Sequence, residues 1–472
     1  MQSYHTNADD EQVAIDENSI AVLPFLNMSS DKEQEYFSDG LTEDIITQLS
    51  KIKSFKVISR TSVMQYKKTP KSIKEIGKEL GVATILEGSV QRSSTKIRIT
   101  AQLINAVSDE HLWSESYDRP VDDIFTIQRE VALAIASVLN TTLTKKESQQ
   151  LDYVPTVNLQ AYDLYMRGKF LVEKRNKTDL LVARELFQQA VAKDRTFADA
   201  YSGLATTYLL SSFRGYEDPT RMLWLAKKNI DTALGLDPSS GEIQATLGYW
   251  YHQTFDWHAA EITYRRAIDL NANQSNVYLW LGILLEAKEE KDEALKVYAR
   301  GTELNPMWDY LVENRIRALV NNNQVDEAIA MQKALVEKSA GDQALQKMYY
   351  GELSRLYWFL NNKEEAVTAA QKSGNKSLLK FYTDGDQSLM EKEVDAHYNE
   401  LKDKSEYISQ VWMGIDYARA GARDKALDCF NNAIALKETA ITFLLLRHFD
   451  FLNIKYLSMA LITRKIRQVI NF

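Results

Sequence analysis

Residues 247–306 read LGYWYHQTFDWHAAEITYRRAIDLNANQSNVYLWLGILLEAKEEKDEALKVYARGTELNP, and this stretch contains one pattern twice. A step of 34 residues separates the two copies at small and aromatic positions alike: Gly248 and Gly282, Ala260 and Ala294, Tyr264 and Tyr298. A fixed period of this length is typical of stacked helical hairpins, because each hairpin must bury its apolar face against the next one. The stretch therefore predicts a helical solenoid.

The residue types at these positions resemble those of tetratricopeptide (TPR) repeats. Each copy has a glycine after an apolar residue, followed by small, aromatic and small positions in the second helix. Glycine lets two antiparallel helices approach closely, and the aromatic ring fills the space beside it. Further copies surround Gly168, Ala205 and Gly414. We predict an all-α right-handed TPR solenoid of about seven repeats over residues 158–440, with one irregular unit, and capping helices over residues 441–472.

One of the earlier copies is longer than the others. Residues 211–220 include Gly215 and Pro219 and add roughly nine residues between the two helices of that unit. Glycine and proline punctuate helical patterns, so we expect an exposed loop here. The TPR resemblance also implies a protein or peptide partner on the concave face, where the first helix of each pair exposes variable side chains. Association of two copies of the chain stays open.

Residues 19–150 have a different pattern of apolar residues, without the 34-residue repeat. Apolar runs and alternating patterns predict strands at residues 19–24, 55–59, 82–91, 96–104 and 111–117, the third and fourth forming a hairpin. Apolar residues at helical spacing predict helices that open at Asp39-Gly40, run over residues 73–82 and close the domain over residues 122–139. This order predicts a mixed α/β sandwich-type domain, preceded by a polar extension of residues 1–18.

The amino-acid sequence of this domain resembles that of the TolB N-terminal-like (FlgO-like) domain. The matching segments are IAVLPF at 20–25, EYFSDGLTE at 35–43, ISRTS at 58–62, EGSV at 87–90 and RITAQLI at 98–104. In relatives this domain and its TPR array often accompany a class III nucleotide cyclase, a kinase or a winged-helix domain. None of those is recognisable in this sequence. The resemblance implies a sensory or regulatory module and specifies no ligand.

A small-ligand site is a hypothesis for the carboxyl ends of the first two strands, where open sheets place their ligand crevices. An arginine and hydroxyls beside a helix N-terminus near Gly40 would suit a small anion. The candidate ligand-binding residues are Asn27, Asp39, Arg60, Thr61 and Ser62. The alternative is that these residues cap turns and that Arg60 pairs with Glu35, Asp39 or Glu43.

Composition narrows the remaining classes of function. Lys and Arg number 57 against 65 Asp and Glu, a net charge of −8, which disfavours general nucleic-acid binding. The single cysteine, Cys429, excludes an internal disulfide and multi-cysteine zinc sites. Residues 440–462 are apolar but contain Arg447 and Asp450, so we predict no membrane insertion. His111, Glu115 and Asp118 do not share one strand face, so no metal site is expected.

Sequence motifs point away from catalysis. Neither a P-loop, a G-x-G-x-x-G after a strand, an H-E-x-x-H nor a G-x-S-x-G occurs. We therefore expect an α+β multidomain protein that needs no cofactor and is not an enzyme. It would serve as an interaction scaffold or regulatory module of bacterial signalling, soluble, in a compartment that the sequence does not specify. The alternative is the ligand-sensing half of a class III cyclase or transcription regulator.

Overall fold

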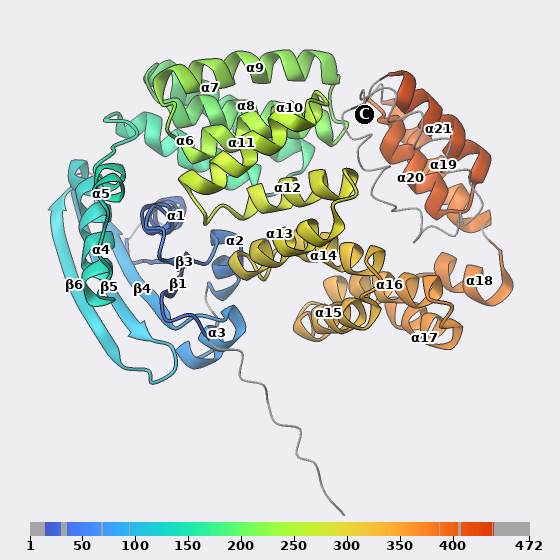
Figure 1. The fold of residues 1–472 in the computed structure, drawn as a ribbon, viewed down its shortest axis with the longest axis horizontal. Helices are drawn as coiled ribbons and strands as arrows, with labels where there is room; N and C mark the ends of the chain where they lie inside the picture. Colours follow the sequence, from blue (N-terminus) through green and yellow to red (C-terminus); the bar gives the residue numbers. More distant parts are fainter. Residues whose placement is uncertain are drawn as a thin grey trace, which may run out of the picture. The chain divides into compact units, whose positions relative to one another are not determined.

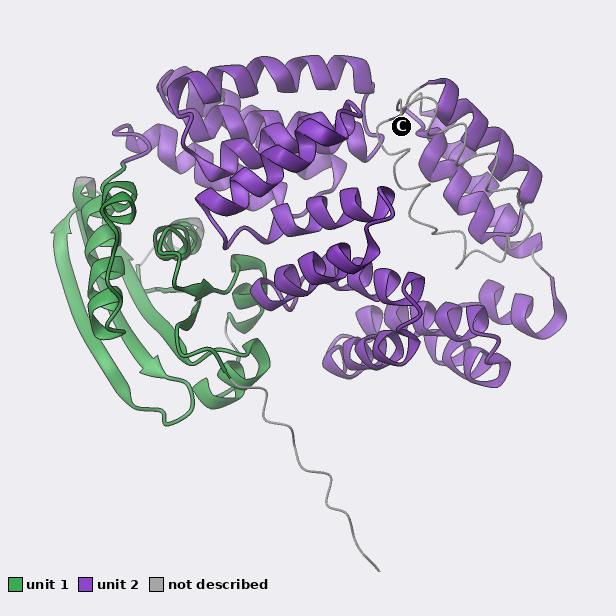
Figure 2. Cartoon of the chain, viewed as in Figure 1, with its two compact units in different colours: residues 1–153 green, residues 154–472 purple. Residues whose placement is uncertain are grey.

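The computed structural model describes residues 15–29, 35–67, 69–93, 95–386, 388–404, 407–436 and 438. The chain forms two compact units, residues 1–153 and residues 154–472 (Figure 2). The first unit combines a sheet with helices, and the second is helical throughout its described part (Figure 1). This confirms the predicted α+β multidomain class. The predicted capping helices of residues 441–472 lie outside the described residues, as do residues 1–14 of the predicted extension.

One mixed sheet forms the base of the first unit, in the order β3-β1-β4-β5-β6, with β2 also paired to β4. The strands are β1 (Ser19–Val22), β2 (Leu26–Asn27), β3 (Lys56–Val57), β4 (Thr84–Arg92), β5 (Lys96–Asn105) and β6 (His111–Pro120). β1 runs parallel to β3 and β4, whereas β4, β5 and β6 are antiparallel neighbours. The predicted hairpin is confirmed, with Thr84 opposite Asn105 and Arg92 opposite Ile97.

The sequence pattern of each strand matches its burial. All four residues of β1 are buried, as expected for a central parallel strand covered on both faces. β5 begins with exposed Lys96, buried Ile97, exposed Arg98 and buried Ile99, so one of its faces packs on the core. β6 lies at the end of the sheet and is mostly exposed and rich in charges. Charged side chains on an edge strand oppose pairing with other chains.

Five α-helices accompany the sheet: α1 (Glu35–Ser50), α2 (Arg60–Val63), α3 (Ile73–Leu80), α4 (Ile124–Val138) and α5 (Lys145–Leu151). α1 packs against α4, and α4 also contacts β5 and β6. The inner face of α4 buries Ile127, Val131 and Ile135, the residues whose helical spacing predicted it. Capping boxes begin α3 at Ser72 and α5 at Thr144, so the first turn of each helix has its amide groups satisfied.

The predicted start of the first helix at Asp39-Gly40 is wrong, because α1 begins one turn earlier at Glu35. Ser38 and Thr42 belong to the helix and are buried. Their hydroxyls donate to the carbonyl oxygens of Glu35 and Ser38, both at 2.9 Å. Polar residues that usually form turns bond here to the helix backbone. Gly40 therefore lies inside α1 and provides no helix N-terminus for an anion.

The second unit contains seven two-helix pairs among its described residues, with two further helices before the last pair. The bounds are α6 (Leu159–Val172), α7 (Lys177–Lys193), α8 (Ala198–Phe213), α9 (Pro219–Leu236), α10 (Gly241–Gln253), α11 (Trp257–Leu270), α12 (Ser275–Ala287), α13 (Lys291–Leu304), α14 (Asp309–Asn321), α15 (Val325–Lys338), α16 (Gln343–Phe359), α17 (Lys363–Ser373), α18 (Lys376–Asp384), α19 (Ser388–Asp403), α20 (Gln410–Arg419) and α21 (Arg423–Ala435). α18 and α19 fall where the sequence register is lost.

Glycine and aromatic residues hold the two helices of a pair together, as the repeat pattern predicts. A Cβ atom added at Gly248 would lie 2.6 Å from the ring of Tyr264. The same atom at Gly282 would lie 2.4 Å from the ring of Tyr298. Both distances are well below van der Waals contact, so only glycine allows the ring to lie flat on the facing helix. These contacts explain why the sequence spacing is constant.

The predicted exposed loop at residues 211–220 is wrong. α8 continues to Phe213, and α9 begins at Pro219 in the first helical position with Asp218 as its cap. Proline fits this position because the first amide of a helix has no intrahelical partner. The extra residues mainly lengthen α8 and α9 to 16 and 18 residues, against 13 and 14 in α10 and α11.

The lengthened α8 reaches the last helix pair of the second unit. The indole nitrogen of Trp412 on α20 donates to the carbonyl oxygen of Phe213 at 3.1 Å, and the two rings lie 6.0 Å apart. Gly215 has a positive φ of 67°, and a Cβ there would lie 2.4 Å from that of Ser409. The insertion therefore brings the second helix pair into contact with the last one.

Candidate functional site

Two arginines and three aromatic residues from four helix pairs meet in the second unit. We call them the arginine–aromatic cluster, defined as Arg175, Arg214, Tyr249, Trp308 and Tyr310. Arg175 follows α6, Arg214 ends α8, Tyr249 lies on α10, and the other two begin α14. Tyr249 is buried and the other four are partly exposed. The cluster is thus built from the ends and faces of the first helices of the pairs.

Ring contacts position both guanidinium groups, and a hydrogen bond also holds that of Arg175. Arg175 lies 4.8 Å from the ring centre of Trp308 and donates to the amide oxygen of Asn276 at 3.0 Å. Arg214 lies 5.4 Å from the ring centre of Tyr310. The hydroxyl of Tyr216 donates to the carbonyl oxygen of Arg175 at 3.2 Å and holds the turn after α6. Stacking on an aromatic face suits a guanidinium group because it is planar and weakly hydrated.

The electrostatics of the cluster show that its members are close and desolvated. Burial, and then the charge of Arg214, lowers the pKa of Arg175. Burial raises the pKa of Tyr249, while the two arginines act in the opposite direction. Tyr249 is itself held by stacking on Trp280, with ring centres 4.3 Å apart and planes 3° from parallel. This arrangement presents positive charge and flat aromatic surface together.

An acidic group lies in the first turns of α14, next to the cluster. It consists of Asp309 and Glu313, with Glu352 from α16. Burial, followed by the charges of Glu352 and Asp309, raises the pKa of Glu313 to about 7. Burial also raises the pKa of Asp309, which accepts a hydrogen bond from the hydroxyl of Tyr349. The two ends of the site therefore differ in the sign of their charge.

Replacing Glu313 by Gln is expected to change how stability depends on pH. The pKa of about 7 in the folded state exceeds the value of about 4.3 of an unperturbed glutamate. The folded chain therefore binds more protons than the unfolded one between these values, and Glu313 lowers stability as pH rises through this window. Melting temperatures of the full chain between about pH 5 and pH 8 should fall less in Glu313→Gln than in the wild type. Equal slopes in Glu313→Gln and in the exposed-site control Glu337→Gln would contradict this assignment.

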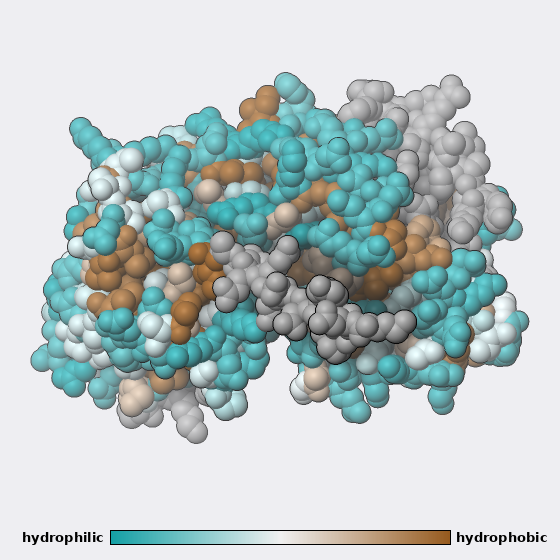
Figure 3. All heavy atoms as spheres, turned by 60° about the horizontal axis from the view of Figure 1, so that its bottom comes forward, coloured by the Kyte–Doolittle hydropathy of each residue, from teal (hydrophilic) through white to brown (hydrophobic). Residues whose placement is uncertain are grey.

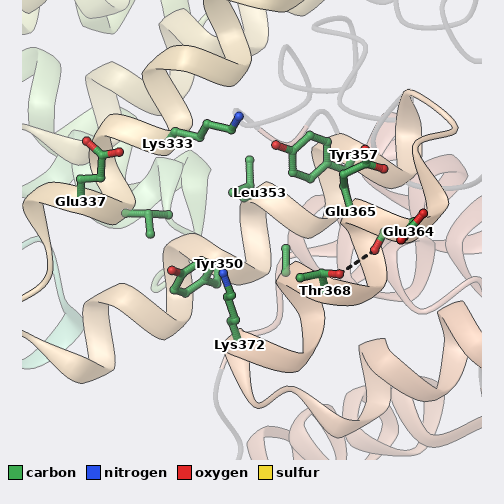
Figure 4. A pocket seen from close by; sticks show the side chains of 11 residues that line it. Lys333, Glu337, Tyr350, Leu353, Tyr357, Glu364, Glu365, Thr368 and Lys372 are labelled. Carbon is green, nitrogen blue, oxygen red and sulfur yellow. Dashed lines mark hydrogen bonds between the residues drawn. The ribbon is translucent and has the colours of Figure 1, made fainter.

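A separate cavity of about 490 Å³ lies between α15, α16 and α17 (Figure 4). Tyr350, Leu353 and Tyr357 provide apolar surface, and positively charged lysines and negatively charged glutamates surround it. In Figure 4 the side chain of Lys333 extends toward the hydroxyl of Tyr357. Lys372 lies 5.3 Å from the ring centre of Tyr350. Its mixed charges give this cavity no preference for an anion or a cation.

The residues predicted from sequence lie in the first unit. The structure brings Asp39 and Arg60 together at 4.0 Å, and Arg60 also lies 3.7 Å from Glu43. Asp39 accepts a hydrogen bond from Lys67 at 2.5 Å. This is the ion pairing that the sequence left open as an alternative. Thr61 and Ser62 follow Arg60 on α2, with Ser62 buried and Thr61 partly buried.

Asn27 is the last residue of β2, and its amide oxygen accepts from the backbone of Ser29 at 2.9 Å. Its predicted role in ligand binding stays a prediction, as do those of Asp39, Arg60, Thr61 and Ser62. The arginine–aromatic cluster was missed by the sequence analysis, because its members span four helix pairs and occupy none of the repeat signature positions. A signal was available in the position of the two arginines, since Arg175 lies in the turn after the first helix α6 and Arg214 ends the first helix α8.

Side chains that often perform chemistry are held in structural roles here. Within the described ranges, no three His, Cys, Asp or Glu residues gather in a way that would hold a metal ion. His252 is buried against the hydroxyl of Tyr264 at 3.4 Å, and burial lowers its pKa to about 4. Burial raises the pKa of Cys429 to about 11, so its thiol stays protonated at neutral pH. Asp118 is paired with Arg98.

Two family models match parts of the chain. Residues 275–306, which contain α12 and α13, match a tetratricopeptide repeat. The second unit therefore carries TPR repeats, as the period predicted. Residues 16–134 match the second domain of HilA/YgeH-like transcriptional regulators. The resemblance of the first unit to TolB N-terminal-like domains stays a prediction.

The chain is also similar to a curated protein of Rhizobium meliloti (strain 1021) named "Putative adenylate cyclase 3". The two are 41% identical over 219 residues, which is 45% of this chain. The match spans 37% of the relative's own length.

No helix among the described residues is both long and apolar enough to span a membrane.

Solved structures show likeness at lower identity. PilF of Pseudomonas aeruginosa is 15% identical, with 48% of this chain and 98% of that chain covered and a TM-score of 0.35. YrrB, described as a TPR protein with an unusual peptide-binding site, is 22% identical, with 41% and 95% covered and a TM-score of 0.31. TolB of Acinetobacter baumannii is 20% identical, with 26% and 28% covered and a TM-score of 0.20.

Proposed function

We propose that this chain is a non-catalytic scaffold whose TPR unit binds a protein or peptide partner on its concave face. The observation that carries the proposal is the arginine–aromatic cluster, which offers charge and flat rings on or next to the first helices of four TPR pairs. Arginine and aromatic side chains are the residues that most often dominate binding energy at protein interfaces. The partner would lie along these helices, with the acidic group around Glu313 as a second contact.

Exposed apolar side chains outside the arginine–aromatic cluster are the other features that could bind a partner. Figure 3 shows one face of the molecule, on which apolar patches interrupt a mostly hydrophilic surface. In the described part of the chain, Trp224 on α9 and Ile262 on α11 are among the exposed apolar residues, at 65% and 56% exposure. Both lie on second helices of their pairs and are isolated from the cluster in sequence. Single exposed apolar residues are common on soluble proteins and need no partner.

Site-specific photo-crosslinking in native cells tests the proposal. A photoreactive amino acid would replace exposed Asn276, beside the cluster on the first helix α12. The matched control replaces Ile262 on the second helix α11. We expect a defined crosslinked partner from position 276 and none of that mass from position 262. The same products from both positions, or none from position 276, would refute binding along the first helices.

A second candidate function is the ligand-sensing half of a nucleotide cyclase or transcription regulator. The matches of residues 16–134 to a regulator domain and of the chain to a cyclase relative favour it. Melting of the full chain with a panel of nucleotides and organic anions would test it. A ligand that raises the melting temperature of the wild type but not of Thr61→Val would support a site on α2. If no compound shifts the wild type, a ligand-sensing role of the first unit is rejected.

A further inference from the structure

The two arginines of the cluster differ from the other shielded arginines of the second unit. In the described part of that unit, every other buried or partly buried arginine has a carboxylate partner: Arg184 with Glu217, Arg300 with Glu303, Arg315 with Glu327, Arg317 with Glu286, and Arg355 with Glu352. Arg175 and Arg214 form no ion pair with any described residue. Each has an aromatic ring instead, and the hydrogen bond of Arg175 goes to the neutral amide of Asn276.

This arrangement places two positive charges close together, and neither forms an ion pair with a described residue. The carboxylate of Glu173 favours the charged form of Arg175 without forming an ion pair with it. A guanidinium group does not lose its proton in proteins, so the repulsion is not relieved by titration. Both groups lie near the carboxyl ends of helices, where the helix dipole supplies about half a negative charge. That partial charge offsets only part of two full charges. Two like charges that are partly shielded from water destabilise the fold, so an anion bound beside them would stabilise it.

Hydrogen-bond donors at the same place are also unused. Nε of Arg214 and the hydroxyl of Tyr310 are buried, and neither has a hydrogen-bond partner among the described residues. Nε of the ion-paired Arg184 and Arg317 is unbonded too, so the hydroxyl of Tyr310 is the more informative donor. Buried polar groups are nearly always bonded in folded proteins, so an unused hydroxyl beside positive charge indicates a missing acceptor. An oxygen anion would accept from both groups and neutralise both charges. Planar oxyanions such as carboxylates, and phosphates, match the fork of an arginine.

We propose that Arg175 and Arg214 form the binding site for an oxyanion carried by a peptide segment of the partner. The inference rests on the proposed scaffold function, since it names the chemistry of the partner at the same surface. The rings of Trp308 and Tyr310 hold the guanidinium groups on one side, and the N–H groups that form no hydrogen bond with described residues would donate to the anion. The oxyanion is either a carboxylate or a phosphate, because both present acceptor oxygens to the same donors.

The stability of the free chain provides the first test. Arg214→Gln removes one of two repelling charges while it keeps length and hydrogen-bonding capacity. We expect its melting temperature to equal or exceed that of the wild type. The matched control is Arg184→Gln, which breaks the contact with Glu217 and should lower the melting temperature. A loss in Arg214→Gln as large as in the control would show that Arg214 has a structural counter-charge and would overturn the proposal.

Binding to the full chain provides the second test. The probes are a short polyglutamate peptide, a polyglutamine peptide of equal length, a phosphoserine peptide and inorganic phosphate. We expect one of the two anionic peptides to bind, and Arg175→Gln or Arg214→Gln to weaken it about ten- to hundredfold, as for other charge-assisted hydrogen bonds. The exposed arginine of α9 gives the control Arg221→Gln, which should bind as the wild type does.

The results of these experiments distinguish a failure of the oxyanion site from a failure of the proposed scaffold function. Binding of polyglutamate identifies a carboxylate, and binding of the phosphoserine peptide identifies a phosphate. Binding of inorganic phosphate alone would overturn the peptide origin of the oxyanion. Equal binding of polyglutamine, equal weakening in Arg221→Gln, or no binding by any probe would overturn the oxyanion site. Crosslinking at position 276 leaves both arginines in place, so a captured partner would still support the scaffold if the oxyanion site fails.

Discussion

Replacing Glu286 by Ala is expected to lower the free energy of unfolding of the TPR unit by about 3–5 kcal/mol. Glu286 and Arg317 form an ion pair between α12 and α14, and both side chains are 5% exposed. The hydroxyl of Tyr298 donates to Glu286 at 2.8 Å, and Arg317 donates to the amide oxygen of Asn314 at 2.6 Å. Without Glu286, a buried guanidinium loses its counter-ion and the tyrosine loses its acceptor. Both losses occur where water cannot replace the missing partner.

The measurement is urea unfolding followed by far-UV circular dichroism. Asp231→Ala is the matched control, since the ion pair of Asp231 with Lys227 on α9 is largely exposed and is worth at most about 1 kcal/mol. The double replacement of Glu286 and Arg317 by Leu should recover much of the loss, because two apolar residues leave no unpaired charge. If Glu286→Ala costs no more than Asp231→Ala, the pair is not desolvated and this interpretation is wrong.

The repeat fold was predictable because its packing repeats in sequence. Gly248 and Tyr264, Gly282 and Tyr298, and Gly414 and Phe430 all lie 16 residues apart, and each glycine touches the ring of its partner. Such local contacts are visible as a period. The start of α1 was not predictable by the same reasoning, because Ser38 and Thr42 have turn-forming side chains. They bond instead to the helix backbone, and the hydroxyl of Thr42 also accepts from the amide of Phe25 at 3.0 Å.

The candidate site was not predictable, because it depends on contacts that have no period. Three helix pairs lie between the pair of Arg175 and the pair of Tyr310, and the extra length of α8 sets the position of Arg214. The absence of an ion pair at two arginines, among the described residues, is a property of the folded chain. In the first unit the outcome differs, because Arg60 does have carboxylate partners in Asp39 and Glu43. Only the structure distinguishes an arginine that is neutralised from one that is not.

A second large effect is expected from Phe187→Ala, which should lower the free energy of unfolding by about 3–5 kcal/mol. The ring of Phe187 on α7 is fully buried. It lies between two glycines of neighbouring first helices, Gly168 on α6 and Gly203 on α8. A Cβ added at either glycine would lie 2.7 Å from the ring. Phe187 therefore joins two TPR pairs, and its removal leaves a cavity that rigid helix backbones cannot close.

Compensation between these residues gives the sharpest test of that contact. Gly168→Ala alone should destabilise the chain, because its methyl group would overlap the ring of Phe187. In the background of Phe187→Ala the same methyl group enters the vacated space, so the two changes should show a favourable coupling energy in urea unfolding. Phe170→Ala on α6 is the control, because that ring is 41% exposed and its loss should cost far less. Strict additivity of Gly168→Ala and Phe187→Ala would mean that the two residues do not touch, and the glycine–aromatic contact would then fail as the reason for the repeat spacing.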